Sequence, residues 1–329
     1  MDLAKPTASY RSALLLAALS LPVLASAQTF VEELAWAYAI TPGTAPPAPV
    51  DDGTRHSLPG SDRQFTLDQI RNRMGPADWY PGDHPSMPPI VANGREAAGI
   101  WACSMCHYPN GKGRPENASV VGLPKEYFIQ QMYDFKNGLR NSAEPRKPNT
   151  PIMSGFAVAM TDAEIREAAE YFSSIRWTPW IEVVEADTVP KTRLLGGMHL
   201  RLEGAEAGTE PIGKRIVETP NNTEYTELLR NPRSGFTAYV PRGSIARGEA
   251  LARGAKGTAC SVCHGENLGG LAVVPGLRGR SPSYLARQLA DMKQGQRRGV
   301  WTPLMAPVVA TLSADDILNL SAYLASLAP

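Results

Sequence analysis

Two copies of one short motif, Cys-x-x-Cys-His, constrain this chain more than any other feature of its sequence. They occupy residues 103–107 and 260–264. Two thiols at this spacing can add across the two vinyl groups of one porphyrin, and the adjacent histidine then lies beneath the ring, where its imidazole binds iron. The motifs therefore predict two covalently attached haems, held and ligated by Cys103, Cys106 and His107 and by Cys260, Cys263 and His264.

The chain has four cysteines, and three other uses of them fit less well. A four-cysteine zinc site usually has its two pairs about 15–20 residues apart, whereas Cys103 and Cys260 are 157 positions apart. A thioredoxin-like pair needs a βαβ context, which neither motif offers. Two local disulfides would leave the histidine after each pair unexplained. We therefore expect haem to consume all four thiols and no disulfide to form.

Residues 1–27 have the pattern of an export signal. Lys5 and Arg11 precede an apolar run over 13–25 that is too short to cross a bilayer, and a small-residue cleavage pattern ends at Ala27. A retained membrane anchor fits this length less well. Without the signal the chain carries 31 basic and 31 acidic residues. We expect a neutral periplasmic protein with no retained transmembrane segment, and the lack of a basic excess argues against a nucleic-acid binder.

The sequence repeats itself around the two motifs. A second block, Thr150–Met153, matches Thr302–Met305 at an offset of 152, so the second copy is five residues shorter between the blocks. At roughly 150 residues per domain, 329 residues suit two domains. We call residues 94–176 the first module and 242–329 the second module. At an offset of 157 the matched pairs are Tyr127 and Tyr284, Gln131 and Gln288, Asp134 and Asp291, Lys136 and Lys293, Gly138 and Gly295, and Arg140 and Arg297.

Each module is predicted to be helical. Apolar residues recur at helical spacing over 124–137, and Gly138 ends that stretch. The last helix of the first module opens with a capping box, Thr161-x-x-Glu164, and Ser313-x-x-Asp316 opens the corresponding helix of the second. No strand alternation is evident in either module. The predicted fold class is therefore all-α, with two tandem domains.

A haem iron bound by one histidine needs a sixth ligand if it is to pass electrons without other chemistry, and methionine is the usual choice. The repeat selects Met153 and Met305, which align in Thr-Pro-x-Met segments that we expect to be loops before the last helix. Met132 and Met160 each align with a leucine, which favours core packing for both.

Together these features resemble the tandem di-haem class I cytochromes c. The resemblance rests on the two motifs, a Gly-Leu and Tyr-x-x-x-Gln segment, a Lys-x-Gly-x-Arg stretch and a methionine before the last helix, and it covers roughly half the chain. It implies two all-α domains, each with a low-spin haem ligated by histidine and methionine. It also implies periplasmic electron transfer between a donor complex or dehydrogenase and a terminal acceptor.

Residues 28–93, the N-terminal extension, would be absent from a simple tandem cytochrome. The segment is rich in proline and carries eight acidic and four basic residues. We expect an arm that wraps the first module and covers apolar surface with its aromatic side chains. A gate near a haem edge is the alternative, with His56, His84 or Met87 as further iron ligands.

Residues 177–241, the connector, have β-like content in four stretches separated by glycine and proline. We expect a small β-containing insert packed between the modules, which serves either as a docking surface or as a brace. His199 within it is expected to be structural. The four stretches are Ile181–Val184, Met198–Leu202, Lys214–Glu218 and Phe236–Val240.

Three functional classes remain. The first is an electron carrier that exchanges electrons with redox proteins, among them a membrane respiratory complex or a dehydrogenase. The second is a di-haem peroxidase-like enzyme, which needs one open iron, and the matched methionines argue against that. The third is a dedicated cytochrome subunit of a dehydrogenase or oxidase. The second module has ten basic and five acidic residues, so a basic face that steers an acidic partner is a hypothesis, with an ordinary solvated surface as its alternative.

Overall fold

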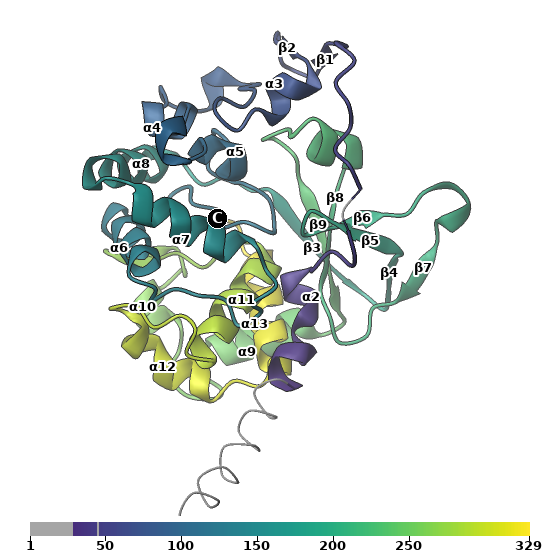
Figure 1. Cartoon of the computed structure of the whole chain (residues 1–329). Coiled ribbons are helices and arrows are strands. Elements are labelled where there is room, and N and C mark those ends of the chain that lie inside the picture. The colour runs from purple at the N-terminus through teal and green to yellow at the C-terminus, as the bar shows by residue number, and fades with distance from the viewer. Residues whose placement is uncertain (1–28, 45) are drawn as a thin grey trace, which may run out of the picture.

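The computed structural model describes residues 29–44 and 46–329. The predicted export signal lies outside these residues. Within them, we find no helix of the length and apolarity that a bilayer crossing requires. The helices of both modules form one body of the molecule, and the strands of the connector lie along its side (Figure 1).

The first module is built from helices whose ends follow the signals in the sequence. Helix α6 keeps within the predicted range, and Gly138 follows it with a φ of 67°. The side chains of Thr161 and Glu164 form the predicted capping box of α8. The last helix of the extension, α4 (Pro89–Ala92), precedes the helices of the module, which are η2 (Glu96–Ala98), α5 (Cys103–His107), α6 (Lys125–Lys136), α7 (Asn149–Ala159) and α8 (Asp162–Ser174).

The second module repeats this arrangement, and Ser313 and Asp316 form the predicted capping box of α13. The expectation that neither module contains a strand is wrong here, because β10 (Gly270–Leu271) pairs antiparallel with β11 (Val274–Pro275). Two-residue strands are too short to leave a periodic pattern in the sequence. The helices are α9 (Ser244–Ala252), α10 (Ser261–His264), α11 (Pro282–Lys293), α12 (Thr302–Ala310) and α13 (Ala314–Ser326).

The two modules contact each other directly along a seam formed by repeat-related residues. Arg140 and Arg297 pair as an antiparallel bridge. On one side of it the Asn141 N–H donates to the carbonyl of Gln296 at 2.8 Å, and on the other the Arg298 N–H donates to the carbonyl of Leu139 at 2.8 Å. Each bond is the repeat counterpart of the other, so the seam has the pattern of a local two-fold axis.

The connector contains a three-stranded sheet in the order β3-β9-β8, in which β3 and β9 are parallel and β8 and β9 antiparallel. The predicted β content is confirmed in all four stretches, although β8 begins at Val217 rather than Lys214. The strands are β3 (Ile181–Ala186), β4 (Thr188–Pro190), β5 (Thr192–Leu195), β6 (Met198–Arg201), β7 (Thr209–Pro211), β8 (Val217–Pro220) and β9 (Phe236–Pro241), with η3 (Gly204–Glu206) and η4 (Glu224–Leu228) between them.

The expectation that the connector is packed between the modules is wrong. Ala238 and Val240 of β9 pack against Leu318 and Ala322 of α13, so the sheet covers the side of the second module (Figure 1). The place between the modules is taken by the seam, since the repeat-related residues there satisfy each other's hydrogen bonds.

The N-terminal extension contacts both modules instead of wrapping only the first, and near its end Ile90 and Val91 are buried in the core of the first module. Leu34 and Tyr38 are buried against Ala286 and Ile317 of the second module. Further along, Trp79 is buried against Leu229 of the connector, and its indole N–H donates to the Leu229 carbonyl at 2.9 Å. The elements of the extension before α4 are α2 (Ala35–Tyr38), β1 (His56–Ser57), β2 (Gln64–Phe65), α3 (Leu67–Arg71) and η1 (Pro81–Asp83).

Candidate functional site

Both Cys-x-x-Cys-His motifs form short helical turns that end at the histidine, in α5 and α10. The residue after each histidine has a positive φ, 61° at Tyr108 and 82° at Gly265. Glycine adopts this conformation readily, whereas tyrosine does so only under constraint. The two motifs therefore share one backbone path despite different residues at the exit.

The two motif histidines make the same second contact. His107 Nδ1 lies 2.8 Å from the carbonyl oxygen of Ala118, and His264 Nδ1 lies 2.8 Å from that of Pro275. A carbonyl only accepts, so Nδ1 carries the proton in each ring and the lone pair is on Nε2. Burial lowers the pKa of both histidines, which favours this neutral form. Ala118 and Pro275 are also 157 positions apart, an alignment that sequence reasoning missed.

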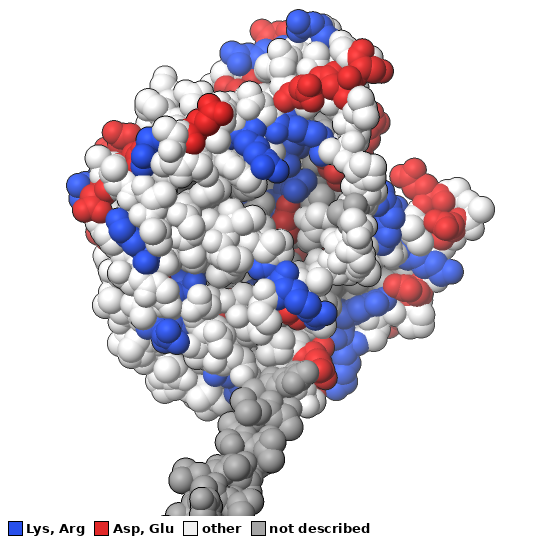
Figure 2. Space-filling view, viewed as in Figure 1, with Lys and Arg blue, Asp and Glu red and all other residues white. Residues whose placement is uncertain are grey.

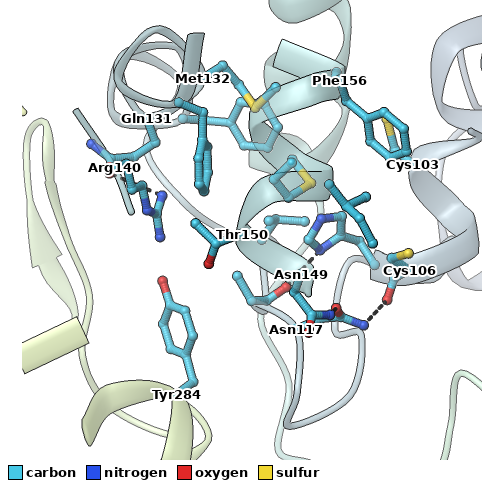
Figure 3. Close-up of a pocket in the computed structure, with 18 of the residues that line it drawn as sticks. Cys103, Cys106, Asn117, Gln131, Met132, Arg140, Asn149, Thr150, Phe156 and Tyr284 are labelled. Atoms are coloured by element: carbon cyan, nitrogen blue, oxygen red, sulfur yellow. Dashed lines mark hydrogen bonds between the residues drawn. The ribbon is translucent and has the colours of Figure 1, made fainter. Parts of the chain in front are cut away.

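A cavity of about 160 Å³ lies against the first motif. Cys103, Cys106, His107 and Met153 all line it, so the structure brings together the four residues predicted for the first site. In Figure 3, Cys103 and Cys106 lie on one side of this cavity and Met132 on the other. Met132 and Met160 line the cavity as well, and both also belong to the buried core of this module.

The methionine segments are helical, which corrects the expectation that they are loops. Met153 lies within α7 and Met305 within α12. Pro151 and Pro303 are near the start of these helices, where a missing backbone N–H costs no helical hydrogen bond. Proline near a helix start was therefore a poor indicator of a loop.

The second motif is partly at the surface, although His264 within it is buried. Cys263 is exposed, and the second-site residues Cys260, Cys263, His264 and Met305 do not line the cavity at the first motif. Five of the seven large apolar side chains most exposed in the described residues belong to this module, namely Val262, Leu271, Val273, Val300 and Leu304. Val262 is in the motif itself, and β10 and β11, which carry or flank Leu271 and Val273, contact α10. The face of a bound haem would cover an apolar surface of this kind next to the motif.

The three alternative ligands in the extension lie away from the cavity. His84 Nε2 is 3.2 Å from a carboxylate oxygen of Asp78, Met87 packs against the core of the first module, and His56 is in β1. None of them lines the cavity. His199 has a structural contact, with Nδ1 3.1 Å from the Thr192 hydroxyl, and burial lowers its pKa to about 4.

One end of the cavity is polar and is built from both modules. Arg140 comes from the first module, whereas Tyr284, Arg287 and Asp291 come from α11 of the second. Figure 3 shows Tyr284 pointing toward Arg140 and Thr150 from the other side of the seam. Lys147 also lines this end, and burial lowers its pKa to about 7, with the nearby Arg287 charge acting in the same direction. Sequence reasoning did not single out Lys147 or Arg287.

The thiol of Cys103 lies in an environment that disfavours its ionised form. All four are free cysteines, and burial raises the pKa of Cys103 to about 12, which disfavours the thiolate that metal binding or disulfide exchange needs. In residues 29–44 and 46–329, no group of three or more histidine, cysteine or carboxylate side chains is placed to hold a metal ion.

The surface charge differs from the count in the sequence. Figure 2 shows charged side chains mainly over the extension and the connector, with a large uncharged area over the helices. Three of the ten basic residues of the second module are buried, namely Arg280, Arg287 and Arg297. Two of its five acidic residues, Asp291 and Asp316, are buried as well, so seven basic and three acidic residues remain to steer a partner, an excess of four instead of five.

Comparison with known proteins agrees with these features. The family model "Cytochrome c" matches residues 91–176. A cytochrome c4 of Stutzerimonas stutzeri is 30% identical over 237 residues, which is 69% of this chain and 85% of that protein. A thiosulfate dehydrogenase electron acceptor of Thiomonas intermedia is 26% identical over 233 residues, 68% of this chain and 78% of that protein. The crystal structure of reduced cytochrome c4 from Pseudomonas stutzeri covers 70% of this chain and 97% of its own, with 23% identity and a TM-score of 0.44.

These matches define a class of haem-binding proteins that transfer electrons. The chain belongs to the cytochrome c family, and it is a cytochrome c4-like electron carrier with a mostly helical fold and a β-containing central region.

Proposed function

We propose that this chain is a di-haem carrier that passes single electrons between periplasmic redox proteins, with one haem in each of the domains 94–176 and 242–329. The observation that carries the proposal is the repeated histidine geometry. In both motifs a backbone carbonyl 2.8 Å from Nδ1 fixes the tautomer that leaves Nε2 free to bind iron. A motif that arose by chance would have no reason to share this contact.

The residues of each site would have separate roles. The cysteine pairs would hold the rings by thioether bonds, the histidines would bind iron from one side, and Met153 and Met305 would bind it from the other. When bound, the haem supplies a one-electron couple between ferric and ferrous iron. The polypeptide fixes the ligand geometry and excludes water, which keeps the rearrangement on electron transfer small.

The carrier is favoured over a di-haem peroxidase-like enzyme. Peroxide chemistry needs an open iron and a group that can move a proton beside it. Asp291 already accepts a hydrogen bond from the Tyr38 hydroxyl at 2.9 Å, and Glu116 pairs through Oε1 with Arg114 at 2.5 Å, which leaves only its Oε2 without a hydrogen bond. The matched methionines at the repeat-related positions support six-coordinate iron at both sites.

A second candidate is the dedicated electron acceptor of a dehydrogenase. The relative from Thiomonas intermedia is named for this role, and the similarity extends over 68% of this chain. The extension and the connector supply surface beyond the two modules for a lasting contact. Carrier and acceptor subunit use the same haem chemistry and differ in how long the partner stays bound, so co-purification with a dehydrogenase would separate them.

The test begins with the full chain matured in a host that attaches haem c. We expect mass spectrometry to show two haems per chain and no signal peptide. Optical and paramagnetic-resonance spectra during a redox titration should show two low-spin haems with sulfur ligation. One five-coordinate, high-spin haem would favour the enzyme, and a bare polypeptide would refute the proposal.

A further inference from the structure

The short helix α2 of the extension reaches the polar end of the cavity. It packs on α11 of the second module, with Leu34, Ala37 and Tyr38 in the buried cluster there, and it ends at Ala39 in a left-handed conformation with a φ of 47°. Its last carbonyl groups are therefore turned out of the helix and are available to side chains from outside it.

Two adjacent residues of α2 contact three charged groups of the cavity wall. The Arg287 guanidinium donates to the carbonyl of Ala37 at 2.6 Å, and Lys147 Nζ donates to the carbonyl of Tyr38 at 3.4 Å. The Tyr38 hydroxyl donates to the carboxylate of Asp291 at 2.9 Å. Lys147 comes from the first module, whereas Arg287 and Asp291 lie on α11 of the second, and α2 contacts all three.

These groups are buried, which makes their charge balance important. Lys147 and Arg287 are each 4% exposed and Asp291 is 6% exposed. Glu116, the other carboxylate of this cavity, pairs with Arg114. Arg140 adds a further positive charge, so the cavity wall carries more cationic than anionic groups. A buried cation without an anionic partner is costly, and this end of the cavity therefore favours an anionic ligand group.

The arrangement is particular to the first site. The repeat counterpart of Arg287 is Gln130, which has no charge. Lys147 lies in the stretch by which the first module is five residues longer than the second, so it has no counterpart. The extension, which supplies α2, occurs once in the chain. The first and second haems would thus experience different local charge.

We propose that residues 35–39 of the extension are a positioning element for the first haem. These residues hold Lys147 and Arg287 in place to bind a haem propionate, and the two cations raise the reduction potential of that haem. The inference rests on the proposed function. Ferric haem carries one more positive charge than ferrous haem, so nearby cations disfavour the oxidised state. Haem propionates are the carboxylates that this cationic end would receive.

The test uses the matured full chain with Lys147→Gln, which removes one cation, and Tyr38→Phe, which removes only the hydroxyl contact to Asp291. The matched control is Lys125→Gln, another lysine of the first module, whose Nζ lies at the surface 2.8 Å from Glu170. Spectroelectrochemistry gives both midpoint potentials, and resonance Raman spectroscopy gives the propionate bending bands. The haem that loses its sulfur ligation in Met153→Ala identifies the first site.

We expect Lys147→Gln to lower the potential of the first haem and to shift its propionate band, with the second haem unchanged. Tyr38→Phe should shift the same haem in the same direction but less, because Asp291 then offsets the two cations more strongly. The inference is wrong if both variants hold two haems and titrate like the wild type, or if Lys125→Gln has an equal effect. Those results would leave the proposed function standing, whereas failure of the wild type to bind haem would remove both. If Lys147→Gln does not fold, the conservative Tyr38→Phe variant decides alone.

Discussion

The guanidinium of Arg297 donates to the side-chain oxygen of Gln131 at 2.7 Å, across the seam between the two modules. The reciprocal pair does the same, since Arg140 donates to the side-chain oxygen of Gln288 at 3.0 Å. Each arginine also bonds the glutamine of its own module, at 3.1 Å in both cases. Four residues at two repeat positions thus close a ring of hydrogen bonds around the Arg140–Arg297 bridge.

This ring should contribute strongly to stability. We expect Arg297→Met to lower the free energy of unfolding by about 2–4 kcal/mol, because it removes hydrogen bonds from a buried charged donor. Arg140→Met should have a similar effect. The exposed neighbour Arg298 makes a single 3.4 Å contact to the Gly138 carbonyl, so Arg298→Met should change stability by less than about 0.5 kcal/mol. Urea unfolding of the three variants measures the difference, and equal losses for Arg297 and Arg298 would contradict it.

The methionine assignment has an optical test. Met153→Ala should open one iron, lower the potential of that haem and allow carbon monoxide to bind to half of the total haem. Met160→Leu is the control, because Met160 lines the same cavity but aligns with a leucine in the other module. Carbon monoxide binding by Met160→Leu, with none by Met153→Ala, would reassign the ligand.

The number of haems per chain tests where haem is attached. Replacing Cys103 and Cys106 by alanine should leave one haem per chain, attached at the second motif. Replacing Cys260 and Cys263 should leave the other one. Intact-mass measurement and peptide mapping give the number and the place, and two haems in either double variant would mean that the motifs are not the attachment points.

The burial of His199 predicts that the folded chain loses stability in mild acid. Burial lowers its pKa from 6.5 to about 4 in the folded chain, so the unfolded chain takes up the proton first as the pH falls. The contribution of this group is complete above pH 6.5 and is lost between 6.5 and 4, by up to about 3 kcal/mol. His199→Gln should flatten the pH dependence of urea unfolding over that interval, and an unchanged slope in this variant would contradict the prediction.

Local signals in the sequence predicted much of the helical fold. Thr161 with Glu164 and Ser313 with Asp316 form their capping boxes because a cap depends on residues only three positions apart. The predictions that the cysteine motifs and Met153 hold haem rest in the same way on spacing and repetition. These parts of the site are specified by short stretches of chain.

Long-range contacts were not predictable in this way. The contact of Tyr38 with Asp291 joins residues 253 positions apart, and nothing in either local sequence indicates it. The extension was expected on the first module because it precedes that module in the chain, whereas Tyr38 is buried against the second. Lys147 was overlooked for a related reason, since it lies in the stretch that the repeat alignment could not compare.

The seam has a consequence for the origin of the chain. A surface whose residues bond their own counterparts is complementary to a second copy of itself, which is the condition for closing a symmetric homodimer. An ancestral protein with a single module and these residues would have had such a surface. Duplication and fusion of its gene would then have made the association permanent, and the two halves would have been free to diverge without losing each other.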